Sequence, residues 1–304
     1  MAASPARGVF VAALTPMKRD LSPDNARFAR HCRWLLDQGA DGLAVLGTTG
    51  EANSFSVAER LALLDALGAE GIPGETLLPG TGSCAIPDTV ELTRKAISVG
   101  AAGVVMLPPF YYKNVSDEGL YASYSEVIQR VGDERLRIYF YHFPQMSSTP
   151  ISHDLIERLL KAYPGTIAGI KDSSGDLDNM LAMCRRFPGF GVFAGSEQFL
   201  VPVLRAGGAG CISATANVTV AACAQIYRQW QSPQAEELQK GLTAQRLAIQ
   251  AKTLIPALKQ ILARAEDDES WLTVRPPVAQ LSPVDVQSLF AGLDSTGFTM
   301  KQAA

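Results

Sequence analysis

The chain has 304 residues, of which 47% are hydrophobic and 19% charged, and its formal net charge at pH 7 is −3. This composition is ordinary for a folded globular protein and excludes a disordered chain. Because Lys and Arg are scattered rather than clustered, the sequence also excludes the basic patch of a nucleic-acid or membrane-surface binder, so we expect a small-molecule partner.

Compartment and metal content are read from the N-terminus and the cysteines. The first residues, MAASPARGVF, lack the basic region followed by an apolar region that is typical of a secretion signal. No apolar run has the length of a membrane span. The five cysteines are odd in number and widely spaced, without a Cys-x-x-Cys pair. We interpret them as buried thiols in a reducing compartment, which predicts a cytoplasmic protein without a metal site.

Short β-rich apolar runs recur along the chain, and each precedes a longer segment with helical periodicity. This alternation is typical of repeated βα units with a parallel sheet. Helical patterns between the runs include residues 25–38, 57–67, 89–99 and 118–130. The eight expected strands are residues 8–14, 42–46, 76–81, 103–107, 137–141, 167–171, 191–194 and 210–213.

Eight such repeats predict a closed (β/α)8 TIM barrel in the α/β class. An open doubly wound sheet is the alternative, but its Gly-rich dinucleotide fingerprint is missing after the first run, where the sequence reads ALTPMKRD. Further helical patterns follow the last run, at 218–231, 234–251, 255–264 and 283–293. We therefore expect a TIM-barrel catalytic domain over 1–220 and a C-terminal helical extension over 221–304.

Lys171 is the strongest candidate for a reactive group. In α/β barrels, catalytic groups project from the C-terminal ends of strands and from the loops that follow them. Lys171 ends the sixth run and precedes a Ser-Ser-Gly-Asp turn. A partly desolvated lysine there is a nucleophile for a ketone, whereas a lysine that reaches solvent is the competing interpretation. Lys18 and Lys113, in other loops, are alternative candidates.

Two further segments carry chemistry. Residues 47–51 read GTTGE directly after a strand, and their backbone N–H groups beside a helix N-terminus suit a substrate carboxylate; a tight turn with capping threonines is the alternative. In RIYFYHFP, Tyr139 and Tyr141 share one face of a strand. The phenol of Tyr141 at the strand end is placed to move protons, although a satisfied core tyrosine is more common.

The chain resembles the family of dihydrodipicolinate synthase and N-acetylneuraminate lyase over residues 8–293. The resemblance rests on GTTGE, on PPFYYK at 108–113, on the Tyr-x-x-Pro of YHFP, and on GIKDSSGD and GCISATANV, in this order. Members are class I aldolases that bind pyruvate as a Schiff base and need no metal or organic cofactor. The resemblance implies a carbon-carbon or carbon-oxygen lyase that assembles as a homotetramer, a dimer of dimers.

By this resemblance Lys171 is the Schiff-base lysine, and Tyr141 is the acid and base for the carbinolamine and the aldol oxygen. Thr48 links Tyr141 to Tyr112, which in the family reaches across a dimer interface. Thr49 and the neighbouring amides, including that of Gly50, hold the 2-oxo acid carboxylate, whereas Glu51 is interpreted as structural. Further expected substrate contacts are Ser173, Gly195, Ile212, Gln145, Met146 and Glu197.

Two positions depart from well-known branches of the family. Met146 stands where the synthase branch has an arginine that grips the semialdehyde carboxylate, and Ala214 replaces a serine that contacts the sugar chain in the sialic acid branch. The resemblance is therefore closer to the branches that cleave or dehydrate a hydroxylated 2-oxo acid, such as 4-hydroxy-2-oxoglutarate or a 2-keto-3-deoxy sugar acid, and implies this activity. The alternatives are 4-hydroxy-tetrahydrodipicolinate (dihydrodipicolinate) synthase activity in lysine biosynthesis and an inactive family member that serves as a binding protein.

Overall fold

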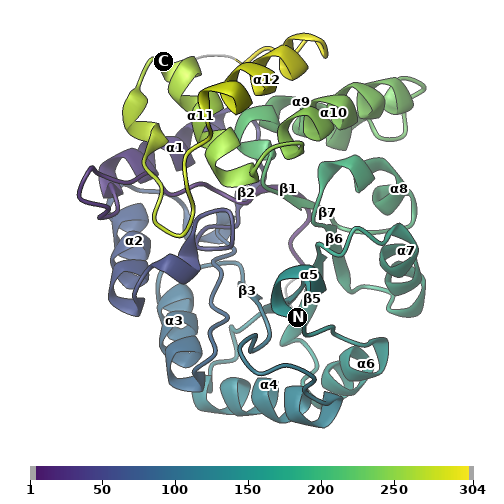
Figure 1. The fold of residues 1–304 in the computed structure, drawn as a ribbon. Helices are drawn as coiled ribbons and strands as arrows, with labels where there is room; N and C mark the ends of the chain where they lie inside the picture. Colours follow the sequence, from purple (N-terminus) through teal and green to yellow (C-terminus); the bar gives the residue numbers. More distant parts are fainter. Residues whose placement is uncertain (1–4, 301–304) are drawn as a thin grey trace.

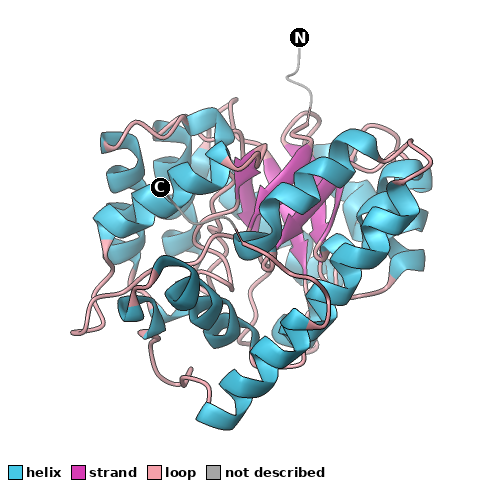
Figure 2. Ribbon diagram, turned by 90° about the horizontal axis from the view of Figure 1, so that it is seen from above, coloured by secondary structure: helices cyan, strands magenta, loops and turns pink. Residues whose placement is uncertain are grey.

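The computed structural model describes residues 5–300, and its parallel strands form a ring inside a ring of helices (Figure 1). Neighbouring strands pair in the order β2-β1-β7-β6-β5-β4-β3. Figure 2 shows the same strands from the side, enclosed by helices. The strands are β1 (Gly8–Val11), β2 (Gly42–Leu43), β3 (Val104–Met106), β4 (Ile138–His142), β5 (Ile167–Asp172), β6 (Gly191–Ala194) and β7 (Gly210–Ser213).

The third expected strand is present only as single backbone bridges. Leu77 bridges Leu43, and Gly80 bridges Val105, both in the parallel sense. Pro79 interrupts a regular ladder because it has no N–H to donate, but its carbonyl accepts a hydrogen bond from the Val105 amide at 2.9 Å. This segment joins β2 to β3 and closes the sheet, so the fold is the predicted TIM barrel.

The first four helices, for which the sequence predicted ranges, begin and end close to the predicted residues. Two of their ends show why: Ser56 and Glu59 form a capping box at the start of α2, and α4 ends at Gly132 in the left-handed conformation. The helices are α1 (Asn25–Asp37), α2 (Val57–Ala69), α3 (Ile86–Ser98), α4 (Asp117–Val131), α5 (Pro144–Ser147), α6 (His153–Ala162), α7 (Leu177–Arg186), α8 (Leu200–Arg205) and α9 (Ala216–Gln229).

Three helices follow α9: α10 (Ala235–Gln250), α11 (Leu254–Glu266) and α12 (Pro283–Asp294). In Figure 1 they lie together along one edge of the barrel, next to α1 and α9. Their apolar faces, with Leu258 and Leu289, form a buried cluster together with Trp271 from the turn between α11 and α12 and Leu14 at the barrel mouth. The boundary expected after residue 220 falls inside α9, and the division into two domains stays a prediction.

The barrel interior is filled by side chains from every strand segment. On β4, Tyr139 and Tyr141 belong to the interior cluster, while Ile138 and Phe140 face the surrounding helices, as the alternation predicts. The hydroxyl of Tyr139 accepts a hydrogen bond from the Ala6 amide at 2.6 Å.

The cysteine prediction was wrong in part. All five cysteines are free thiols, but Cys84 is exposed and Cys184 is half-buried, whereas Cys32, Cys211 and Cys223 are buried. Burial raises the pKa of the three buried thiols far above its usual range. Within residues 5–300, no helix combines the length and the apolar character that crossing a membrane requires.

Candidate active site

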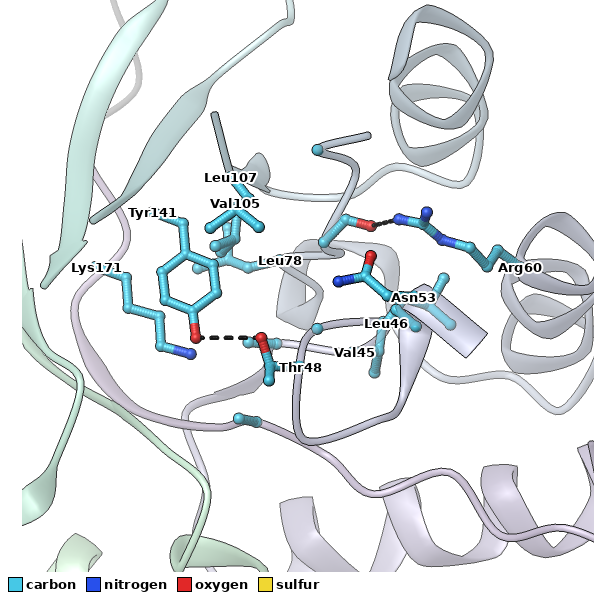
Figure 3. Close-up of a pocket in the computed structure, with 16 residues that line it drawn as sticks. Val45, Leu46, Thr48, Asn53, Arg60, Leu78, Val105, Leu107, Tyr141 and Lys171 are labelled. Atoms are coloured by element: carbon cyan, nitrogen blue, oxygen red, sulfur yellow. Dashed lines mark hydrogen bonds between the residues drawn. The ribbon is translucent and has the colours of Figure 1, made fainter. Parts of the chain in front are cut away.

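Lys171 and Tyr141 are paired residues on adjacent strands. They stand opposite each other in the β4–β5 register, and the Lys171 Nζ lies 4.2 Å from the centre of the Tyr141 ring. In Figure 3 the two side chains run side by side and reach toward Thr48. Lys171 is only 6% exposed, so its amine lies in a sheltered end of the barrel mouth. The amine and the phenol can therefore contact the same atoms of one bound molecule.

A β-bulge in β5 brings Lys171 to this side of the strand. Ile138 pairs with Ile167, but the next residue, Tyr139, pairs with Gly169, so Ala168 is an extra residue on β5. A regular ladder over the same residues would turn Lys171 toward the surrounding helices. The bulge corrects the alternation and places the amine inside the barrel.

The loop after β2 supplies a hydroxyl and free amides. The Thr48 Oγ1 lies 3.5 Å from the Tyr141 hydroxyl, across the gap drawn in Figure 3. Within residues 5–300, the amides of Thr48, Thr49 and Gly50 make no hydrogen bonds to other residues, whereas the next amide, of Glu51, donates to the Thr48 carbonyl at 3.0 Å. Unpaired donors in a mostly buried loop suit an anionic ligand.

A cavity of 510 Å³ opens beside these groups. This volume lies within the usual range for sites that bind small molecules. Its walls come from the C-terminal ends of the strands and also from α10, α11 and the segment that follows. The lining includes Thr48, Thr49, Tyr141, Met146, Lys171, Ser173, Gly195, Ser196, Arg246, Gln250 and Thr253.

Asp172 and Gly195 shape the part of the cavity next to Lys171. The buried Asp172 carboxylate accepts hydrogen bonds from the Ser174 amide at 2.8 Å and from the Asn179 side chain at 2.7 Å, which fixes the turn that carries Ser173. A Cβ at Gly195 would lie 2.1 Å from the Ser173 Oγ, so only glycine allows this close approach. Asp172 was not singled out from the sequence, although it stands in the GIKDSSGD motif.

Not every expected contact residue lines this cavity. Ile212 is buried in the barrel interior, and Gly50 packs against the Ala13 carbonyl. Glu197 is fully buried and paired with Arg246, so its carboxylate supports the wall rather than forming it. These three residues are absent from the lining.

Gln145 and Met146 lie on α5, and only Met146 lines the cavity. The Gln145 amide donates to the Ser174 carbonyl at 2.5 Å. The Met146 side chain is 60% exposed, so it stands at the open rim. Neither residue provides a charge at this rim.

The alternative lysines do not line the cavity. Lys18 is exposed in the loop after β1. Lys113 is exposed and donates to the Phe110 and Ser147 carbonyls, the latter at 3.2 Å. Tyr112 is 74% exposed, outside the cavity and next to Tyr111, with the two ring centres 5.4 Å apart. Within one protomer, Tyr112 is therefore not brought to Thr48 and Tyr141.

Glu51, the last residue of GTTGE, ties the loop after β2 to the C-terminal helices. Its carboxylate accepts from the Lys259 Nζ at 2.6 Å and from the Arg275 amide at 3.0 Å, and both charged side chains of the ion pair are buried. Burial lowers the pKa of Lys259, and the negative charge of Glu51 opposes this shift. The structural interpretation of Glu51 agrees with this arrangement.

Sequence reasoning missed Arg246, Gln250 and Thr253, which close the far side of the cavity. Arg246 and Gln250 stand one helical turn apart on α10, and the Arg246 Nε donates to the Gln250 Oε1 at 2.9 Å. The only available signal was their spacing on a predicted helix, which is also common on solvated faces.

Comparisons with known proteins agree with this geometry. The sequence model of the dihydrodipicolinate synthetase family matches residues 5–294. An uncharacterized DapA-like lyase of Chloroflexus aurantiacus is 32% identical over 291 residues, which cover 95% of this chain and 96% of the relative. A 4-hydroxy-tetrahydrodipicolinate synthase of Thiobacillus denitrificans is 33% identical over 217 residues, 71% of each chain.

Among solved structures, dihydrodipicolinate synthase from Agrobacterium tumefaciens is 29% identical and superposes with a TM-score of 0.89, covering 95% of this chain and 99% of that chain. The similarity therefore extends over the barrel and the C-terminal helices together. By the extent of these matches, the chain belongs to the dihydrodipicolinate synthetase family, whose members are pyruvate-dependent class I lyases.

Proposed function

We propose that the protein is a Schiff-base lyase that releases pyruvate from a hydroxylated 2-oxo acid. The observation that carries this proposal is the Lys171 amine beside the Tyr141 phenol at one end of a 510 Å³ cavity. We assign the carboxylate next to the ketone to Thr48, Thr49 and the neighbouring amides, which make no hydrogen bonds to other residues within residues 5–300. The substrates expected from the sequence, 4-hydroxy-2-oxoglutarate or a 2-keto-3-deoxy sugar acid, fit this class.

The chemistry follows from these two groups. The Lys171 amine adds to the ketone carbon, and Tyr141 gives its proton to the departing hydroxyl, which leaves as water. The resulting iminium withdraws electrons, and the Tyr141 phenolate accepts the proton of the substrate's C4 hydroxyl while the C3–C4 bond breaks. An aldehyde leaves, and protonation at C3 and hydrolysis of the imine return pyruvate and the free amine.

Dehydration is possible from the same intermediate. Loss of a proton from C3 of the iminium gives an enamine, which expels the C4 hydroxyl as water when that group is protonated. Cleavage and dehydration thus share the imine and differ in the bond that breaks. Hydroxyl groups of Ser173, Ser196 and Thr253 line the cavity and favour a hydroxylated chain in either case.

The test is covalent capture of the imine. Borohydride added with pyruvate should raise the intact mass by one reduced adduct, and peptide mapping should place the adduct on Lys171. Lys171→Arg keeps the positive charge and should give no adduct, while the matched controls Lys18→Arg and Lys113→Arg should behave as the unchanged protein. An adduct on another lysine, or none in an active preparation, would overturn the assignment.

A second candidate, 4-hydroxy-tetrahydrodipicolinate synthase, is favoured by the name of the relative from Thiobacillus denitrificans. Against it, Met146 provides no charge at the cavity rim, whereas an arginine would donate charge-assisted hydrogen bonds to the semialdehyde carboxylate. Loss of such an interaction corresponds to roughly 30- to 1000-fold in rate. A panel should be assayed for pyruvate release or uptake: 4-hydroxy-2-oxoglutarate, 2-keto-3-deoxygluconate, N-acetylneuraminate, and pyruvate with aspartate semialdehyde. We expect pyruvate and aspartate semialdehyde to react slowly. If this pair instead had the highest kcat/KM of the panel, the second candidate would be established.

The proposal extends to assembly and location. The exposed Tyr111 and Tyr112 form a projecting aromatic pair, which supports a dimer contact in which Tyr112 reaches a partner's site. We expect a homotetramer in the cytoplasm, with residues 1–220 as the catalytic domain and residues 221–304 as the extension. Sedimentation measures the assembly directly.

A further inference from the structure

Arg246 is a cationic group in the cavity that the proposed chemistry does not use. It projects from α10, lines the cavity and is 11% exposed. Its Nη1 lies 3.1 Å from the Glu197 carboxylate and from the Ser213 Oγ, and 3.0 Å from the Thr215 Oγ1. These contacts hold the guanidinium in one orientation before any ligand binds.

The second terminal nitrogen of Arg246 is available for a ligand. Within residues 5–300, the Nη2 makes no hydrogen bond and no ion pair, and it does not belong to the buried polar atoms that lack partners. Since the side chain lines the cavity, this nitrogen is the one left to face it. A planar guanidinium fixed on one edge presents its other edge in a defined direction.

Among the charged residues of the cavity lining, Arg246 is the one left to bind an anionic ligand. The charged residues of its lining are Lys171, Asp172 and Arg246. Lys171 is the amine that reacts, and both oxygens of Asp172 already accept hydrogen bonds. Outside the lining, Arg205 pairs with Glu236 on the surface.

We propose that Arg246, with Gln250 and Thr253, binds a carboxylate at the far end of the substrate. This inference rests on the proposed function and narrows its substrate class to hydroxylated 2-oxo acids with a second carboxylate, such as 4-hydroxy-2-oxoglutarate or a 2-oxo-3-deoxyaldarate. A sugar acid that ends in a hydroxymethyl group leaves the Arg246 charge without an anionic partner. Arg246 projects from α10 and Met146 from α5, so Arg246 does not restore a charge at the Met146 rim.

The size of the effect follows from a charge-assisted hydrogen bond. Losing one such bond in a sheltered cavity corresponds to about 10- to 100-fold in rate. The nearby Glu197 places the expected preference toward the lower half of this range, because its carboxylate offsets part of the guanidinium charge.

The test uses two probes that differ only at the far end. Both 4-hydroxy-2-oxoglutarate and 4-hydroxy-2-oxopentanoate release pyruvate on cleavage, but the second has a methyl group in place of the far carboxylate. We expect kcat/KM to favour the dicarboxylate by at least about tenfold. In Arg246→Gln the ratio of the two values should fall to about one.

Arg246→Gln leaves the Glu197 carboxylate buried without its partner, and we expect this variant to lose stability for that reason alone. The double variant Glu197→Gln with Arg246→Gln removes both charges and keeps the measurement possible, with circular dichroism to confirm folding. Arg205→Gln is the matched control, since it removes a surface arginine and should leave the ratio unchanged.

The outcomes separate this inference from the proposed function. If borohydride still captures pyruvate on Lys171 but the intact protein cleaves both probes equally well, the role of Arg246 is wrong and the lyase proposal stands. An unchanged ratio in the folded double variant would also overturn the inference. If no adduct forms at Lys171 with either probe, the proposed function itself fails.

Discussion

Tyr141 and Lys171 stand opposite each other on adjacent parallel strands, with the lysine Nζ 4.2 Å from the centre of the tyrosine ring. Their separation is set by the sheet, because side chains of paired residues on one face of neighbouring strands are adjacent. The amine and the phenol are thus positioned by backbone hydrogen bonds rather than by flexible loops. Preorganisation of this kind is favourable for catalysis.

Replacing the phenol tests its role as acid and base. Tyr141→Phe keeps the ring beside Lys171 and removes only the hydroxyl, so turnover should fall by about 10²- to 10⁴-fold. Thr48→Val removes the hydroxyl that lies 3.5 Å away and should cost less, about tenfold, since Tyr141 keeps its own proton. Steady-state rates on the best substrate of the panel measure both, and full activity of Tyr141→Phe would contradict the mechanism.

Replacing Tyr112 tests whether its hydroxyl completes the active site of a partner subunit. Tyr112→Phe should lower turnover by one to three orders of magnitude, about 1.4 to 4 kcal/mol, while the barrel stays folded. Tyr111→Phe is the matched control, because it removes the same group from the neighbouring residue, which is 73% exposed against 74% for Tyr112. A fully active monomer in sedimentation, or a larger effect from Tyr111→Phe, would show that Tyr112 does not complete the site.

The buried pair of Glu51 and Lys259 should stabilise the fold only while both charges are present. Glu51→Gln leaves a lysine buried without its counter-charge, which should cost about 3 to 5 kcal/mol of unfolding free energy in urea. Glu51→Gln with Lys259→Met should cost less than Glu51→Gln alone. The surface variant Glu157→Gln, whose partners Lys161 and Arg186 are both exposed, is the control and should change stability by about 0 to 1 kcal/mol. Equal losses of unfolding free energy in all three variants would show that the buried pair contributes no more to stability than a surface pair.

Stability should fall in mild acid because of His31. Burial lowers the pKa of His31 from 6.5 to about 4, although its hydrogen bond to Asn217 opposes the shift. Between these two values the unfolded chain binds a proton that the folded chain does not, so the folded state loses stability as the pH falls from about 6.5 to about 4.

The shifted pKa of His31 should lower the unfolding free energy by about 2 kcal/mol between pH 7 and pH 5. His31→Gln retains a donor for Asn217 but does not titrate, so its unfolding free energy should change less over the same interval. Urea unfolding of both proteins at the two pH values gives the difference. Identical pH dependence in the two proteins would exclude His31 as the cause.

The residues that we propose to react were singled out from the sequence because their signals are local. Lys171 and Tyr141 each end an apolar run, and the end of a strand in an α/β barrel opens onto the site. Thr48 follows a strand in the same way. The bulge in β5 was not predictable, since the segment Ile-Ala-Gly-Ile-Lys fits a regular strand equally well.

The far side of the cavity could not be predicted, because it depends on how α10 and α11 pack on the barrel. Arg246 shows no local sign of its role, and Glu197 was expected to contact substrate but is buried as its partner. The third strand was expected as a continuous run, and Pro79 reduces it to bridges. In each case the missing information is a contact between residues far apart in the sequence.

The cavity is lined by two separate parts of the chain. Lys171 and Tyr141 lie on strands, whereas Arg246, Gln250 and Thr253 come from the segment after α9. Under the proposed function, changes in the later segment would alter substrate choice while the reaction is retained. Such an exchange has one constraint: an incoming segment must still bring a cation opposite Glu51, or the loop after β2 loses its buried ion-pair partner.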